Sequence, residues 1–183
     1  LILVVSPTLP VHNVAELVAY AQARPGELNY STPGARTIYH LEGERFKLRT
    51  GIDIVHIPYR GLVPALAELI SGNVEMSFAS LPAALPLIRA GRVRALAVAS
   101  AVRSPLLPDV PTLSESGVDG VDATVWYGIL APAGTPPDVV GILAGAIRDA
   151  ARSPEYLQAL MDMGASPLVT TPDEFGRKLR DEV

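Results

Sequence analysis

The sequence predicts an α/β fold in which short buried strands alternate with amphipathic helices. Five apolar runs have the length of strands: residues 2–5, 28–31, 53–57, 74–78 and 94–99. Segments with apolar residues at helical spacing separate them. With 183 residues, of which 49% are hydrophobic and 19% charged, the chain is sufficient for one core, or for one complete lobe with part of a second.

The expected helices have recognisable ends. In the first half they are predicted at residues 14–21, 37–49, 62–70 and 82–90, the first behind Asn13 and the third before Gly72. Three more are predicted near the C-terminus. Thr135, Ser153 and Thr171 each directly precede a proline, and a capping residue followed by a proline at the first helical position marks a helix start.

Alternation of this kind implies parallel strands, with right-handed crossovers that place helices on both faces of the sheet. Residues 100–120 differ, because Pro105, Pro108 and Pro111 indicate irregular chain. Thr112 and Glu115 predict a short helix that begins with a capping box. We interpret this segment as a loop that covers the fold. Residues 123–131 are long for one strand and would suit a crossing between two lobes.

The composition argues against several functions. A net charge of -4, a pI near 5.3 and 5% aromatic residues give little basis for binding nucleic acid. The chain has no cysteine, so thiolate catalysis is excluded. Residues 123–137 are uncharged, but glycines and prolines interrupt them, so no membrane span is expected. Residues 1–5 indicate a buried strand with no features of a secretory signal, and we expect a missing segment upstream.

In an open α/β sheet, ligands bind beyond the carboxyl ends of the strands, where helices begin with unpaired N–H groups. Three such places are residues 31–37, 58–62 and 79–82. In the first, Ser31, Thr32 and Thr37 supply hydroxyls around a turn at Pro33 and Gly34, which suits a carboxylate. An ordinary capped turn explains the same residues, and the local sequence alone favours it.

Other candidates also have two interpretations. Tyr59 and Arg60 could close over an anion or lie in solvent. Ser80 is either a helix cap or a ligand donor, and the cap is preferred. His40 either faces the pocket or belongs to a hydrogen-bond network within the fold, which we favour. Trp126 and Tyr127 are more typical of core or hinge packing than of ligand stacking, although a crossing between lobes would place them at the cleft floor. We find no catalytic motif, and the histidines lack metal-ligand spacing.

Beyond these local features, the order of several blocks resembles a known family. Residues 28–41, LNYSTPGARTIYHL, are similar to the signature loop of the substrate-binding proteins of tripartite tricarboxylate transporters, the Bug receptors. The block VHIPYRG at residues 55–61 continues the similarity. Further matching blocks lie at residues 64–66, 72–75, 94–98, 107–112 and 131–136. Ordered blocks over nearly the whole chain are far more specific than one turn, and they outweigh the capped-turn interpretation.

The resemblance implies a periplasmic-binding-protein-like fold of type II, with one complete lobe and the C-terminal part of the other. Residues 1–6 would form a crossing strand, residues 7–123 the second lobe, and residues 124–183 the return crossing with part of the first lobe. The implied function is capture of a small carboxylate or related organic solute in the periplasm for membrane transporter subunits. Neither a catalytic residue nor a metal or cofactor is expected. A sensory ligand-binding module and, less favoured, an enzyme acting on a small organic acid are the alternatives.

The resemblance also suggests which residues form one wall of the ligand cleft. They are Ser31, Thr32, Gly34, Ala35, Arg36, Thr37, Tyr59, Ser80 and Thr124. Arg36 departs from the family pattern, because the loop usually has a small residue near this position, so its side chain adds charge to the site or occludes it. The apolar stripe within residues 139–151 has no complete partner sheet in this sequence, and we expect it to be exposed and to favour association.

Overall fold

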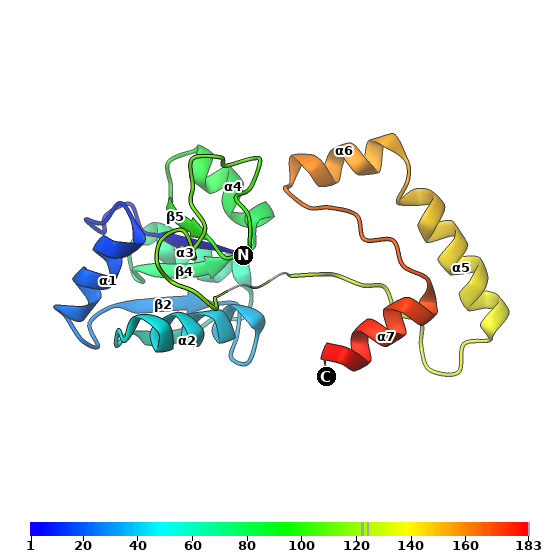
Figure 1. Cartoon of the computed structure of the whole chain (residues 1–183), viewed down its shortest axis with the longest axis horizontal. Coiled ribbons are helices and arrows are strands. Elements are labelled where there is room, and N and C mark those ends of the chain that lie inside the picture. The colour runs from blue at the N-terminus through cyan, green and yellow to red at the C-terminus, as the bar shows by residue number, and fades with distance from the viewer. Residues whose placement is uncertain (122, 124, 183) are drawn as a thin grey trace. The chain divides into compact units, whose positions relative to one another are not determined.

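The computed structural model describes residues 1–121, 123 and 125–182, which form two compact units, Leu1–Val125 and Trp126–Val183 (Figure 1). The first unit contains β1 (Ile2–Val5), α1 (Val14–Gln22), β2 (Asn29–Thr32), α2 (Ile38–Thr50), β3 (Val55–Pro58), α3 (Leu62–Ser71), β4 (Met76–Ala79), α4 (Leu81–Arg89) and β5 (Arg94–Val98). The second contains α5 (Pro137–Ala150), α6 (Pro154–Asp162) and α7 (Pro172–Glu182).

The five strands form one sheet in the order β3-β2-β4-β1-β5. Strand β2 pairs in parallel with both β3 and β4, as expected. The prediction of a wholly parallel sheet is wrong for β1, which runs antiparallel to β4 and to β5. A continuous apolar run shows that a strand is buried on both faces, but it contains no information about direction.

Helices cover both faces of this sheet. Neighbouring side chains of a strand point to opposite faces, so the apolar residues of β1 contribute to a core on each side. Leu3 and Val5 pack in the core on the side of α1 and α2, which contribute Leu17 and Phe46 among others. Ile2 and Val4 pack in a second core with residues of α3 and α4, such as Leu69. All four side chains of β1 are fully buried, as are those of β4, the middle strand of the sheet.

The segment after β5 covers the sheet edge, as predicted. Val98 donates to the carbonyl of Pro111 and accepts from the N–H of Leu113, whose side chain is buried. Thr112 and Glu115 form the expected capping box, with reciprocal hydrogen bonds of 2.7 and 3.0 Å. The predicted helix is wrong, because only turns follow, and Gly117 takes a φ of 83° that ends the helical path.

Two of the three C-terminal caps are confirmed. The hydroxyls of Ser153 and Thr171 accept hydrogen bonds from the third N–H of α6 and α7. The cap at Thr135 is wrong, because α5 begins one residue later, behind Pro136, and the Thr135 hydroxyl donates to Pro132 instead. The described residues of 123–131 contain no strand.

Trp126 packs within the second unit. Its ring lies edge-on to Phe175 at 5.5 Å, and the ammonium of Lys178 lies 5.2 Å from the ring centre. This agrees with the packing interpretation of Trp126. Tyr127, in contrast, is 82% exposed.

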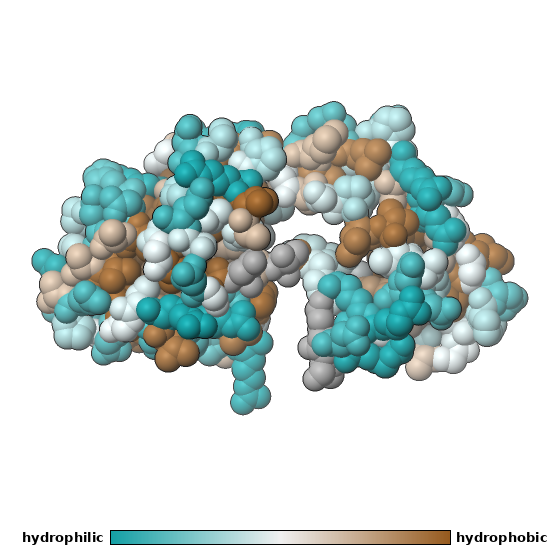
Figure 2. All heavy atoms as spheres, in the orientation of Figure 1, coloured by the Kyte–Doolittle hydropathy of each residue, from teal (hydrophilic) through white to brown (hydrophobic). Residues whose placement is uncertain are grey.

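The apolar stripe of α5 is exposed. Ile142 is 71% exposed and Leu143 is 48% exposed, and Val139 and Ile147 are also at the surface. Figure 2 shows hydrophobic residues at the surface of this unit. In the described part of the chain, every helix is too short or too polar to cross a bilayer.

Close packing of α2 on the sheet gives a first prediction. A Cβ atom at Gly43 would overlap the Tyr30 ring and lie 2.8 Å from its Cζ, and Tyr30 is fully buried. Gly43→Ala should therefore lower the free energy of unfolding by about 1–3 kcal/mol, measured by urea denaturation. Gly145→Ala in α5 is the control, since its Cβ would meet open space and should raise stability by about 0.5–1 kcal/mol. Equal effects of the two substitutions would contradict the packing argument.

The exposed stripe gives a second prediction. The chain should self-associate as its concentration rises, and the double substitution of Ile142 and Leu143 by glutamine should reduce this association. Sedimentation velocity measures both effects. Val63→Gln is the control, because Val63 is 82% exposed on α3 and lies outside the stripe. A cooperative unfolding transition of the unsubstituted chain that is independent of concentration would count against the prediction.

Candidate functional site

Three helix N-termini meet at one edge of the sheet. Since β2 runs parallel to both of its neighbours, β3 and β4, the carboxyl ends of the three strands are adjacent. The next helix begins within a few residues of each end, behind Thr37, Gly61 and Ser80 as the N-cap residues of α2, α3 and α4. The structure therefore brings together the three places that the sequence suggested, and each helix directs a partial positive charge to this edge.

The turn after β2, residues 33–37, is held at several points and is called the anion loop below. The Thr37 hydroxyl donates to the carbonyl of Gly34 at 2.8 Å and accepts from the N–H of His40. The neighbouring loop contributes two backbone bonds, from Tyr59 to the carbonyl of Thr32 and from Gly61 to that of Pro33. These bonds fix the loop to the first turn of α2 and to the end of β3.

The hydroxyls of Ser31 and Thr32 lie beneath this loop. Both residues are fully buried. The Ser31 hydroxyl donates to the carbonyl of Ala65 in α3, whereas that of Thr32 lies 2.6 Å from Nε2 of His56 and also bonds Gly34. In this structure the Thr32 hydroxyl supports the loop from within the protein, and the Ser31 hydroxyl ties β2 to α3.

The backbone of the anion loop is unusual. Gly34 has a φ of 154°, and Arg36 has a φ of 64°, a left-handed conformation that costs a residue with a side chain about 1–2 kcal/mol. Within the described part of the chain, the N–H groups of Ala35, Thr37 and Ile38 make no hydrogen bond. Three donors thus lie in or beside the anion loop at the positive end of α2.

The remaining predicted site residues are placed unevenly. Tyr59 follows β3, and burial, together with the charge of Glu68, raises the pKa of its phenol. Ser80 is partly exposed at the start of α4, and its hydroxyl makes no capping bond. Thr124 lies outside the described residues. Its predecessor Ala123 is bonded through its N–H to the carbonyl of Ala99, near the same edge.

The structure shows a cluster of rings that sequence reasoning did not find. The imidazoles of His40 and His56 stack at 3.9 Å with an angle of 11°, and the Tyr30 ring lies 4.9 Å from His56. His40 Nδ1 accepts the N–H of Arg36 at 3.1 Å. His40 thus bonds within the fold, as the favoured interpretation expected, but it also lines a solvent-open hollow with Arg36 and Thr37, so the two interpretations are not exclusive.

A carboxylate sits at the far side of these rings. Glu44 accepts a bond of 2.6 Å from the Tyr30 hydroxyl and another from Lys47. Burial alone would raise the pKa of the Glu44 carboxyl, but these hydrogen bonds hold it below its ordinary value. Burial, and then the hydrogen bond to Glu44, raises the pKa of Tyr30 far above its ordinary value. Tyr30 therefore stays a neutral donor and Glu44 a charged acceptor.

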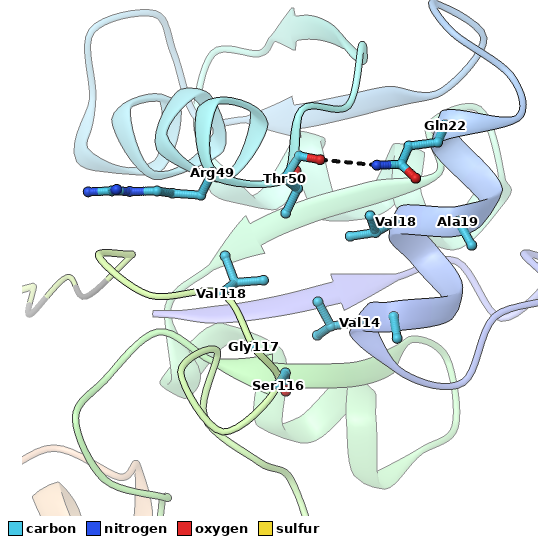
Figure 3. Close-up of a pocket in the computed structure, with 10 residues that line it drawn as sticks. Val14, Val18, Ala19, Gln22, Arg49, Thr50, Ser116, Gly117 and Val118 are labelled. Atoms are coloured by element: carbon cyan, nitrogen blue, oxygen red, sulfur yellow. Dashed lines mark hydrogen bonds between the residues drawn. The ribbon is translucent and has the colours of Figure 1, made fainter.

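Two hollows mark the surface of this unit. One, of about 330 Å³, is open to solvent and is lined by Arg36, Thr37, Ile38, His40, Leu41 and Glu44. The other lies among α1, the end of α2 and residues 116–118 (Figure 3). Gln22 and Thr50, which share a hydrogen bond there, lie at the opposite end of α2 from the anion loop. Of these two hollows, the first adjoins the edge with the three helix N-termini.

Sequence comparison places this arrangement in a family. The family model described as "Tripartite tricarboxylate transporter family receptor" matches residues 1–183. The chain belongs to this receptor family. BugT of Bordetella pertussis is 38% identical over 183 residues, which are 100% of this chain and 56% of BugT. A relative from Pseudomonas sp. strain P51, the UPF0065 protein in the tcbD-tcbE intergenic region, is 34% identical over 182 residues, which are 99% of this chain and 54% of that protein.

Solved structures of other receptors confirm the fold. An R. palustris protein with adipate matches with a TM-score of 0.95 and 38% identity, over 99% of this chain and 60% of that one. The periplasmic binding protein BugD matches with a TM-score of 0.94 and 29% identity, over 100% and 62%. MatC from Rhodopseudomonas palustris with bound malate matches with a TM-score of 0.89 and 28% identity, over 99% and 63%.

These matches confirm the predicted family and the periplasmic-binding-protein-like α/β fold. The relatives found are receptors and binding proteins rather than enzymes. The chain spans about half the length of the curated relatives it matches. The division into residues 1–6, 7–123 and 124–183 stays a prediction, as do the ligand contacts.

The left-handed Arg36 gives a third prediction. Arg36→Gly should raise the free energy of unfolding by roughly 1 kcal/mol, because glycine adopts this φ without steric cost. Urea denaturation measures the change. Arg148→Gly within α5 is the control and should lower stability by about 1 kcal/mol, since glycine is unfavourable in a helix. If both substitutions lower stability, the Arg36 backbone is not strained.

Proposed function

We propose that the protein containing this chain is an extracytoplasmic solute-binding receptor that captures a small carboxylate at the anion loop and presents it to a tripartite tricarboxylate-type transporter. The observation that supports this most is the meeting of the N-termini of α2, α3 and α4 at one sheet edge. Helix N-termini bind carboxylates through backbone N–H groups and the helix dipole. A protein with a net charge of -4 needs such local donors to attract an anion.

The proposed contacts follow from which groups are available. The N–H groups of Ala35 and Thr37 at the anion loop would bind one carboxylate, and Gly34 allows close approach because it has no side chain. Tyr59 and Ser80 supply hydroxyls from the two neighbouring strand ends. Arg36 adds a positive charge at the rim. The buried hydroxyls of Ser31 and Thr32 bond within the protein, to Ala65 and Gly34, and Thr124 stays a prediction for the same ligand.

Related structures point to the size of the ligand. One neighbour was solved with adipate and another with malate, both short dicarboxylates. The N–H groups of the anion loop and the charge of Arg36 would bind one carboxylate. A second carboxylate of the same ligand would bind to groups outside the loop. We therefore propose a small mono- or dicarboxylate.

The same proposal has three further parts: the protein binds its ligand without converting it, it serves a transporter, and it is located in the periplasm. The family is named for transporter receptors, and two neighbours are described as periplasmic. An enzyme would require a base or nucleophile positioned beside the ligand. The alternatives are a sensory module with the same pocket and an enzyme for a small acid. Capture of the ligand-bound form by transporter membrane subunits, with the acid recovered unchanged, would distinguish the receptor from both.

Thr37 gives the fourth prediction. In the full-length protein, Thr37→Leu should weaken binding of malate or adipate by about tenfold or more, because it removes the cap of α2 and places an apolar side chain at the anion loop. Isothermal titration calorimetry at neutral pH measures the affinity.

The matched control is Thr171→Leu, which removes a threonine cap from α7. It should lower stability by a similar amount, about 1 kcal/mol, and leave affinity unchanged. Equal affinity of the unsubstituted and the Thr37→Leu proteins would show that the anion loop is not part of the ligand-binding site. No binding of any mono-, di- or tricarboxylate by the unsubstituted protein would reject the proposed ligand class.

A further inference from the structure

The stacked histidines connect the two ends of the anion loop. His56 Nε2 lies 2.6 Å from the hydroxyl of Thr32, where the loop begins. His40 Nδ1 accepts the N–H of Arg36, near its end. The 3.9 Å stack joins the two rings, so one packed pair fixes both ends of the loop. The rings belong to different elements, since His40 lies in α2 and His56 in β3.

The bond from Arg36 determines the protonation state that the loop requires. An N–H donor needs a lone pair on Nδ1, and an imidazole that accepts at Nδ1 carries its proton on Nε2. The imidazolium has a proton on both nitrogens and accepts no hydrogen bond. Protonation of His40 would therefore break its bond to Arg36 and place two donors face to face. Arg36 is already held in a left-handed conformation, so the loss of this bond favours another loop conformation.

Several charged or titratable groups surround the histidine pair and affect whether His40 takes up a proton. On α2, Glu44 Oε1 lies 3.9 Å from His40 Nε2, and Lys47 and Tyr30 contact the same carboxylate oxygen. On β3, a charged His56 would repel a charged His40 across the stack. Burial, and then the neighbouring His40, lowers the pKa of His56. The folded state therefore binds a proton on His56 less well than the unfolded chain does, so His56 contributes less to folding stability as the pH falls below its ordinary pKa.

Partial exposure leaves the proton a route to the pair. The His40 side chain is 26% exposed and lines the open hollow beside Arg36. A fully buried imidazole would exchange protons only when the fold opens, whereas His40 meets solvent in the folded state. Histidine is the side chain whose ordinary pKa puts its charge change between about pH 5 and 8.

We propose that His40 is a positioning residue whose neutral imidazole holds the anion loop in its ligand-binding form, so that uptake of a proton by His40 loosens the loop and releases the carboxylate. The proposal of release rests on the proposed function. The link between His40 and the loop does not, because it concerns contacts that exist without a ligand.

The first test follows the loop without ligand. In NMR spectra of the ligand-free full-length protein, the amide signal of Arg36 should shift with pH in step with the His40 ring signal. In His40→Asn this titration should disappear, because the asparagine oxygen accepts the same N–H and takes up no proton in this range. His12→Asn is the matched control, since His12 is exposed outside this cluster, and should leave the titration unchanged. An Arg36 signal that does not follow His40 would overturn the proposal.

The second test measures malate and adipate binding to the full-length protein by calorimetry. Affinity of the unsubstituted protein should fall about tenfold more than that of His40→Asn between roughly pH 7.5 and pH 5.5. The comparison cancels titration of the ligand itself. His40→Ala, which lacks an acceptor, should bind weakly at both pH values, and His40→Asn should restore binding.

The outcomes separate the two proposals. Equal pH dependence in both proteins would overturn proton-linked release and leave the receptor function intact. If neither acid binds at neutral pH, that function fails for these acids, while the NMR titration still decides whether His40 controls the loop.

Discussion

The parallel pairing of β2 with β3 and β4 is the constraint on which the candidate site depends. Hydrogen bonding on both sides of β2 brings the carboxyl ends of the three strands to one edge. Each strand is followed at once by a helix, so three helix N-termini and their orphan N–H groups come to the same place. The antiparallel β1 preserves this arrangement, because it extends the sheet beyond β4 without placing another crossover helix at the edge.

Order in the anion loop comes from side chains that lie beneath and behind it. The hydroxyls of Thr32 and Thr37 both bond Gly34, one from the end of the strand and one from the start of the helix. The N–H of Arg36 is held by His40. These bonds satisfy some backbone groups of the loop and leave other donors available, which is what a preorganised anion site requires.

Much of the fold was predictable from the sequence, and the reasons are local. The strand at residues 2–5 and the helix behind Asn13 follow from apolar periodicity and a capping residue. Other strand boundaries shift by one or two residues, as for Val55–Pro58, where hydrogen-bond pairing rather than hydropathy sets the ends. The direction of β1 and the one-residue error at Thr135 depend on tertiary contacts and on two consecutive prolines, which periodicity does not resolve.

The position of the loop was also predictable, but its means of support was not. Ser31, Thr32 and Thr37 were recognised as hydroxyls near a strand end, yet the sequence did not show which of them would turn inward. The histidine stack depends on two features of the fold. The parallel register of β2 and β3 places Tyr30 beside His56, and α2 packs over these two residues so that His40 reaches them. Residues 16 positions apart meet only through this register, because neither helical nor strand spacing brings them together. The aromatic and histidine residues at the starts of adjacent elements were the available signal. These rings hold the backbone of the loop, so in the proposed site the attraction for an anion would come from backbone dipoles and would need no counter-charge buried beside the ligand.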